Sequence, residues 1–132
     1  DAMSAPLSRV QIVKAWVTGD TTRERVYDVA TSAAGDASVD LATCTPRGTG
    51  ADSLCGVWRD PEFDPAVPAV YYARVIENPT CRWSRRLCNA QRVDCATLTP
   101  DSPWRACCGG TVADTVEERA WTSPIWYLPP RP

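Results

Sequence analysis

The stretch Ala69–Glu77, with the sequence AVYYARVIE, constrains the fold more than any other part of the chain. Aromatic and β-branched residues dominate it, and the pairs Asp64-Pro65 and Asn78-Pro79 mark its two ends. Apolar side chains occupy both alternating sets of positions, so both faces of the predicted strand are apolar. Such a strand belongs in the middle of a sheet, and the sequence therefore predicts a partner strand on each side of it.

Further strands are predicted around this one. The turn signal Thr18-Gly19-Asp20-Thr21 separates two alternating segments, so residues 9–31 predict a β-hairpin. A second hairpin is predicted farther along the chain, and the last strand contains Pro124, which must lie at a bulge or on an edge. No segment has the periodicity of an amphipathic helix. The predicted strands span residues 9–17, 24–31, 37–44, 53–59, 69–77 and 116–128.

The 132 residues are the size of one domain, residues 1–132, and the strand pattern predicts an all-β, antiparallel β-sandwich of the immunoglobulin-like type. Residues 79–115 are too long for a hairpin loop and are expected to form an insertion between the last two strands. Tyr71 is expected to form a tyrosine corner. Arg74 and Glu77 lie on opposite faces of their strand, and Arg74 is expected to pair with a carboxylate of the last strand. The candidates are Glu117 and Glu118.

The chain contains seven cysteines, a content typical of exported proteins. Cys44 and Cys55 lie on the two arms of the second predicted hairpin, so we expect a disulfide between them that contributes about 3 kcal/mol. The other five lie in the insertion and lack both the paired knuckles of a zinc site and a C-x-x-C motif. We expect disulfides there too, with open connectivity and one cysteine left over. These five are Cys81, Cys88, Cys95, Cys107 and Cys108.

Composition narrows the function classes. The 14 basic and 16 acidic residues are nearly balanced, which disfavours nucleic acid as a partner. No apolar run approaches the length of a membrane span. The chain has no histidine, which removes the commonest general base and the commonest metal ligand. We therefore expect no enzymatic activity of this chain alone, and assign no catalytic residue, metal ligand or cofactor.

Two weaker patterns leave alternatives open. The acidic residues Asp60, Glu62 and Asp64 lack the glycine and terminal glutamate of an EF-hand loop, so a solvated loop is expected. Asp28, Asp40 and Glu77 would support a carboxylate-based enzyme only if two of them met in an open cleft. Arginine and tryptophan recur close together, which suggests either packing of the insertion or a secreted module that binds carbohydrate or anions. These residues are Arg82, Trp83, Trp104, Arg105, Arg119 and Trp121.

The phrases VQIVKAWV, RVYDVATS, VWRDPEFDPAVPAVYYARVIENPTCRW and ERAWTSPIWY, in this order, resemble the C-terminal region of domain-of-unknown-function family 3604. The resemblance covers essentially the whole chain. It implies an exported bacterial protein, several times longer, with a metal-dependent hydrolase-like domain of the polymerase-and-histidinol-phosphatase type. The His- and Asp-rich metal centre of that domain would lie N-terminal to this region.

The resemblance implies a fragment of this larger protein, a non-catalytic module in the periplasm or outside the cell. Its expected partner is the upstream catalytic domain, which it would buttress. A sheet that has lost this neighbour should leave an edge or an apolar face uncovered, so we also expect a homo-oligomer.

Overall fold

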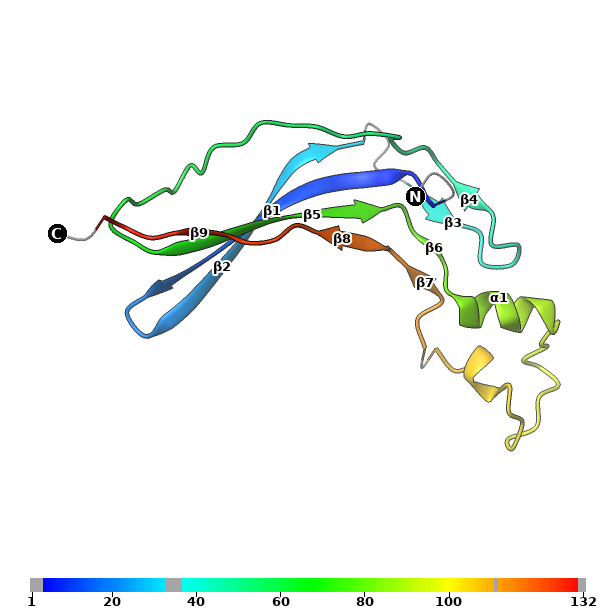
Figure 1. The fold of residues 1–132 in the computed structure, drawn as a ribbon. Helices are drawn as coiled ribbons and strands as arrows, with labels where there is room; N and C mark the ends of the chain where they lie inside the picture. The colour runs from blue at the N-terminus through cyan, green and yellow to red at the C-terminus, as the bar shows by residue number, and fades with distance from the viewer. Residues whose placement is uncertain (1–3, 33–36, 111, 131–132) are drawn as a thin grey trace.

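The computed structural model describes residues 4–32, 37–110 and 112–130. Within these residues the chain forms a five-stranded sheet and two small two-stranded sheets (Figure 1). The large sheet has the order β2-β1-β5-β8, and β9 pairs with β5 beside β8. All the pairings are antiparallel, which confirms the prediction of an all-β, antiparallel fold. The strands of the large sheet are β1 (Leu7–Thr18), β2 (Thr21–Thr31), β5 (Ala69–Glu77), β8 (Arg119–Trp121) and β9 (Ile125–Tyr127).

The hairpin predicted from residues 9–31 is confirmed as β1 and β2, whose register closes at the pair Thr18 and Thr21. Gly19 has a φ of 59°, a conformation that suits glycine in a tight turn. The register shifts once between Val10 and Gln11. This irregularity changes the local twist where the hairpin approaches the start of the sheet.

The central strand is confirmed with the predicted bounds, because β5 spans Ala69–Glu77 and has β1 on one side and β8 with β9 on the other. The strand predicted at residues 116–128 is interrupted. Thr122 still bonds to β5, since its backbone N–H donates to the carbonyl of Ala73 and its hydroxyl accepts from the N–H of Ala73, both at 3.0 Å. Pro124 has no N–H for the ladder, so β9 begins only after it, and both pieces lie on the edge of the sheet.

The second predicted hairpin is wrong. The strand β3 (Ser38–Val39) pairs instead with β4 (Pro46–Arg47). Residues 52–68, which we call the strap, run along the large sheet and belong to no strand (Figure 1); they contain turns at residues 61–62 and 65–66. The strap follows a single bridge between Leu7 and Ala51 and leads directly into β5.

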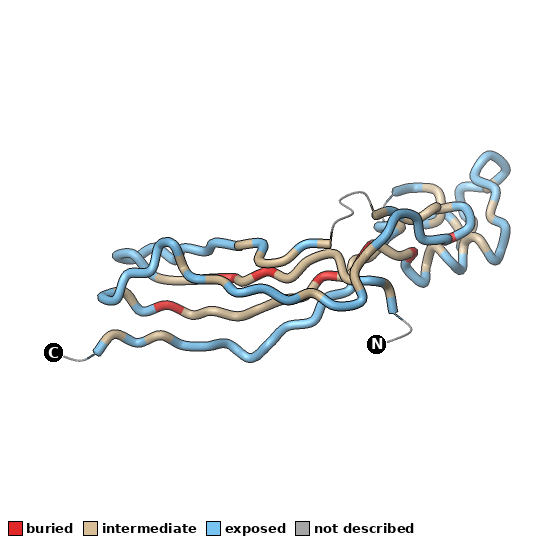
Figure 2. Tube along the Cα trace, turned by 90° about the horizontal axis from the view of Figure 1, so that it is seen from above, coloured by how far each residue is buried: buried red, intermediate tan, exposed pale blue. Residues whose placement is uncertain are grey.

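The strap covers one face of the large sheet, the strap face. Across the opposite face, the open face, no described segment packs a second sheet, so the immunoglobulin-like sandwich is not confirmed. Buried residues are few and lie mainly along the sheet (Figure 2). Val13 and Ile76 are the only large side chains fully buried among the described residues, at 0% and 1% exposure. The described residues therefore form one large sheet that the strap covers on one face, without a second layer of strands.

The insertion follows β5 and contains a helix. Strand β6 (Thr80–Cys81) pairs with β7 (Thr115–Val116), and between them lie α1 (Trp83–Ala90) and the short 3-10 helix η1 (Arg105–Cys107). The expectation that the chain has no helix is therefore wrong for α1. None of the helices among the described residues is long and apolar enough to cross a membrane.

Candidate functional site

A buried ion pair holds the strap to the sheet. The Nζ of Lys14, on β1, lies 2.5 Å from Oδ2 of Asp60 in the strap, and the two side chains are only 5% and 7% exposed. Lys14 also donates to the carbonyl oxygen of Glu62 at 2.8 Å and lies 4.9 Å from the ring centre of Trp16. Tyr71 donates its hydroxyl to the same Asp60 oxygen at 2.7 Å. Lys14 and Tyr71 are cross-strand partners on β1 and β5, so the register brings both donors to one carboxylate.

This environment changes the acidity of two of these groups. Burial raises the pKa of the Asp60 carboxyl, but the hydrogen bonds from Lys14 and Tyr71 outweigh burial and leave the pKa below its usual value. Burial, and then the neighbouring Asp60 carboxylate, raise the pKa of Tyr71. Asp60 is therefore an anion and Tyr71 a hydrogen-bond donor. Each polar group has a partner, and the cluster acts as an anchor for the strap.

Aromatic contacts extend the anchor toward β2. Glu62 accepts hydrogen bonds from Arg25 and from the hydroxyl of Tyr27, the latter at 3.0 Å. The ring of Trp58 packs 4.9 Å from Tyr27 and 6.2 Å from Tyr71. A cavity of about 370 Å³ lies beside these groups. Lys14, Arg25, Glu62 and Tyr71 line it, and their polar atoms are already engaged in holding the strap.

The acidic run therefore differs from the expected solvated loop. Asp60 is buried and paired, and Glu62 is bound to β2. Asp64 is exposed, and its side chain accepts from the N–H of Ala66 at 2.9 Å within a turn. Across the described residues, no group of three His, Cys, Asp or Glu side chains is arranged to hold a metal ion.

A polar ladder crosses the open face. The amide nitrogen of Gln11 donates to Asp28 at 2.6 Å, and Nε of Arg74 donates to the amide oxygen of Gln11 at 2.6 Å. The expected pairing of Arg74 with Glu117 or Glu118 is thus wrong. The register places Arg74 opposite Gln11, whereas Glu117 lies 3.5 Å from Nη2 of Arg9.

Around this ladder the open face is apolar. Val13, buried at the centre, is paired with Val26 on β2 and Tyr72 on β5. Trp121 is opposite Arg74 and Trp126 is opposite Val70, so the edge strands add two large rings to the same face. Their exposure is 60% for Trp121 and 70% for Trp126, and Val17 and Val26 are also exposed. An exposed tryptophan pair on one sheet face is typical of a contact surface.

Six cysteines form three disulfides, and the one disulfide that was predicted is not among them. Cys44 bonds to Cys81, Cys88 to Cys107 and Cys95 to Cys108. The predicted Cys44–Cys55 disulfide is wrong, because residues 53–59 lie in the strap and not beside residues 37–44. Cys55 is exposed and is the free cysteine among the described residues, which confirms that one would be left over.

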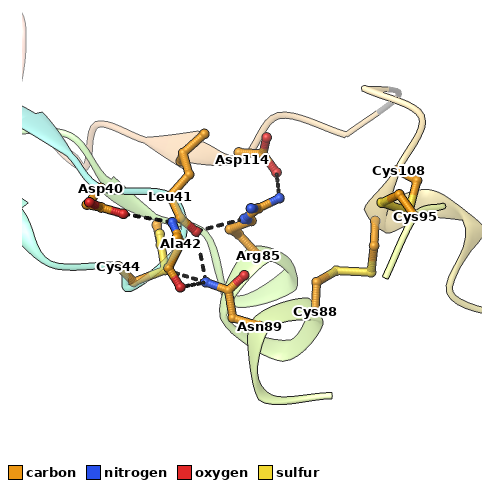
Figure 3. A network of polar contacts seen from close by, with 12 residues as sticks. Asp40, Leu41, Ala42, Cys44, Arg85, Cys88, Asn89, Cys95, Cys108 and Asp114 are labelled. Carbon is orange, nitrogen blue, oxygen red and sulfur yellow. Dashed lines mark hydrogen bonds and ion pairs between the residues drawn. A yellow bond between two sulfur atoms is a disulfide. The ribbon is translucent and has the colours of Figure 1, made fainter. Parts of the chain in front are cut away.

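The insertion is fixed to the rest of the chain through the inner side of α1 (Figure 3). Arg85 Nε donates to the carbonyl of Leu41 at 3.0 Å, and the amide nitrogen of Asn89 donates to the same carbonyl at 2.8 Å. Arg85 also lies 3.6 Å from Asp114, and Cys88 on the same helix forms a disulfide with η1. These contacts join α1 to the loop after β3 and to the end of the insertion.

The arginines and tryptophans predicted as a platform do not gather in one place. Arg82 and Trp83 lie at the start of α1, Trp104 and Arg105 lie at η1, and Arg119 and Trp121 lie on β8. The only cation lying over an aromatic ring among the described residues is Lys14. Glu77 accepts a hydrogen bond from the Ser4 hydroxyl at 2.6 Å. The carboxylates Asp28 and Asp40 are bound to separate partners, Gln11 and Arg47.

Sequence reasoning missed the Lys14–Asp60 anchor. One signal was present, since Lys14 is the only lysine of the chain and stands among apolar residues in a strand. A lysine in such a position requires a buried counter-charge. The identity of that partner depends on the path of the strap, which the sequence does not reveal.

Residues 1–129 match the model of the family described as "Protein of unknown function (DUF3604)". This match covers nearly the whole chain and agrees with the resemblance seen in the sequence. Neither the curated proteins nor the solved structures contain a match to the chain.

Proposed function

The chain belongs to the family described as "Protein of unknown function (DUF3604)", and we propose that it is a non-catalytic module of a larger, exported, metallohydrolase-like protein. In this proposal the open face of its sheet packs against the catalytic domain, of the polymerase-and-histidinol-phosphatase type. The observation that carries the proposal is the uncovered apolar face with Trp121 and Trp126 exposed by 60% and 70%.

The open face suits a large, permanent contact better than solvent. One aromatic side chain can bury about 150–250 Å². Trp121 and Trp126, together with the adjacent Val17, Val26 and Tyr72, therefore offer a patch of several hundred Å², about the size that marks interaction sites. An apolar sheet face is stabilised by packing against another layer, and the strap covers only one of the two faces. A partner on the open face would supply the second layer of the expected sandwich.

The residue chemistry of the chain favours a structural, non-catalytic role. The metal centre implied by the resemblance is rich in histidine, and this chain has none, so its residues do not fit that centre and we derive no catalytic step from them. Lys14, Asp60 and Tyr71 bind one another to hold the strap. Three intramolecular disulfides support export, because such bonds persist in oxidising compartments.

Association of two separately produced parts tests the proposal. The chain is mixed with the remainder of its parent polypeptide, and binding is measured by sedimentation and calorimetry. We expect a one-to-one complex that Trp126→Ser weakens by about thirtyfold, the loss of a typical hot-spot residue. Trp83→Ser, on α1 and outside the open face, is the matched control and should leave the affinity unchanged.

Three outcomes would contradict the proposal. The first is no association between the two parts. The second is hydrolysis of phosphate esters by the chain alone with added divalent metal. The third is a complex insensitive to Trp126→Ser. Self-association that persists in the presence of the remainder and disappears in Trp126→Ser would assign the open face to a homo-oligomer instead.

A further inference from the structure

The helix α1 is oriented with polar side chains toward the rest of the protein and apolar side chains toward solvent. Arg85, Cys88 and Asn89 face the loop after β3 and η1, where each is bonded (Figure 3). On the other side, Trp83 is 72% exposed and Leu87 is 39% exposed. The helix is thus held by its polar residues, and its apolar stripe remains available.

Positive charge flanks this stripe. Arg82, at the N-cap of α1, and Arg86, within its second turn, are both exposed. No carboxylate of the described residues forms a salt bridge with either guanidinium, whereas Arg85 is paired with Asp114. Residues 79–115 contain five arginines and three aspartates, although the whole chain has a net charge of −2. The insertion is therefore the basic part of an acidic protein, and its ligand should carry negative charge.

We propose that the outer face of α1, formed by Arg82, Trp83, Arg86 and Leu87, binds an anionic oligosaccharide. The indole of Trp83 stacks on the apolar face of a sugar ring, and the guanidiniums of Arg82 and Arg86 pair with its carboxylate or sulfate groups. Arginine suits this role because its planar fork matches such oxyanions. This surface lies in the insertion, apart from the open face, and the inference does not depend on the proposed function.

The size of the surface favours a sugar over a macromolecular partner. Trp83 and Leu87 together expose about 250 Å², on the scale of one large aromatic side chain. A stable protein contact needs about 800 Å² on each partner. A helix that lies in a membrane interface needs a long apolar stripe, and α1 has eight residues. One ring and two cations are sufficient for an acidic sugar unit.

The surface is also rigid before any ligand binds. Cys81, two residues before Trp83, is tied to Cys44, and Cys88 within the helix is tied to Cys107. Asn89 binds two carbonyls of the loop after β3, at 2.8 and 3.0 Å. A preorganised site loses less conformational entropy on binding.

The test uses the full chain with its disulfides formed and oligogalacturonate as the probe, with binding followed by calorimetry at low salt. We expect saturable binding, at least about tenfold weaker for Trp83→Ala and for Arg86→Gln. The neutral cello-oligosaccharide of equal length should bind at least about tenfold more weakly than the acidic one. Dextran sulfate, in a parallel titration, distinguishes a sulfate preference from a carboxylate preference, and tighter binding of either acidic sugar supports the proposal.

Two matched variants keep the test specific. Trp121→Ala removes an exposed tryptophan of the sheet, and Arg23→Gln removes an exposed arginine of β2, so both should bind as the wild type does. Near-ultraviolet circular dichroism confirms that every variant is folded. The proposal is overturned by absence of saturable binding to both acidic sugars, by equal losses in the Arg23→Gln and Arg86→Gln variants, or by binding only to anionic phospholipid vesicles.

Discussion

The ion pair between Lys14 and Asp60, which anchors the strap, should contribute strongly to the free energy of unfolding. In Asp60→Asn the carboxylate becomes a neutral amide of the same shape, while the Lys14 side chain, only 5% exposed, loses its counter-charge. Breaking a buried ion pair by removing one partner costs about 3–5 kcal/mol. The amide can still accept one hydrogen bond, so we expect the lower end, about 3 kcal/mol at pH 7. That is a large share of a typical domain stability of about 5–15 kcal/mol.

Urea unfolding, followed by tryptophan fluorescence with the disulfides intact, measures this loss. Asp52→Asn, at an exposed position of the same segment, is the matched control and should change the free energy of unfolding by less than about 0.5 kcal/mol. The double variant Lys14→Met with Asp60→Asn removes both charges and should recover most of the stability. A loss below about 1 kcal/mol in Asp60→Asn would refute the reasoning.

The same anchor should depend on pH. Because the pKa of Asp60 is lowered in the folded protein, its ionisation adds stability above the unfolded pKa, about 3.9. This contribution is lost as the pH falls through the folded value. The difference in stability between wild type and Asp60→Asn should therefore shrink in acid. A difference that stays constant down to pH ~2 would show that the charge of Asp60 is not responsible.

Two further predictions concern the strap. A Cβ at Gly56 would lie 2.8 Å from the carbonyl oxygen of Val29. Gly56→Ala should therefore displace the strap and lower the free energy of unfolding by about 1–3 kcal/mol, as measured by urea unfolding. An unchanged urea midpoint would contradict this packing. Ellman's reagent should detect one thiol per molecule in the native chain, at the exposed Cys55, and none in the Cys55→Ser variant. Two or more thiols in the native chain would contradict the disulfide connectivity described above.

The central strand Ala69–Glu77 and the hairpin of residues 9–31 could be predicted because the sequence patterns that specify them are local. Alternation and turn chemistry lie within each segment, and the structure needs no distant residue to explain them. The prediction failed at residues 53–59 for an instructive reason. Their alternation is real, since Trp58 packs on the sheet while Val57 points outward with 98% exposure. Alternation marks an extended chain lying on a surface, and it does not require a neighbouring strand.

The cysteine pairing and the helix depended on information that the sequence lacks. Cys44 pairs with Cys81, which is 37 residues farther along the chain. Cys55 lies in the strap, which leads away along the sheet, so it does not meet Cys44. The helix α1 is amphipathic, with Trp83 and Leu87 one turn apart, but it has only eight residues. Two apolar residues in one turn, inside a cysteine-rich segment, are too short a pattern to distinguish a helix from a loop.

The strap also has a geometric consequence for the sheet. It is attached at one end through Ala51, bridged to Leu7, and at the other end through its direct continuation into β5 (Figure 1). Between these points the anchor at Asp60 fixes its height above the strands. A chain of fixed length, tied at both ends and in the middle, limits how far the curved sheet can straighten or bend. Insertions or deletions in the strap would therefore change the curvature of the opposite face, and with it the shape of any partner that fits there.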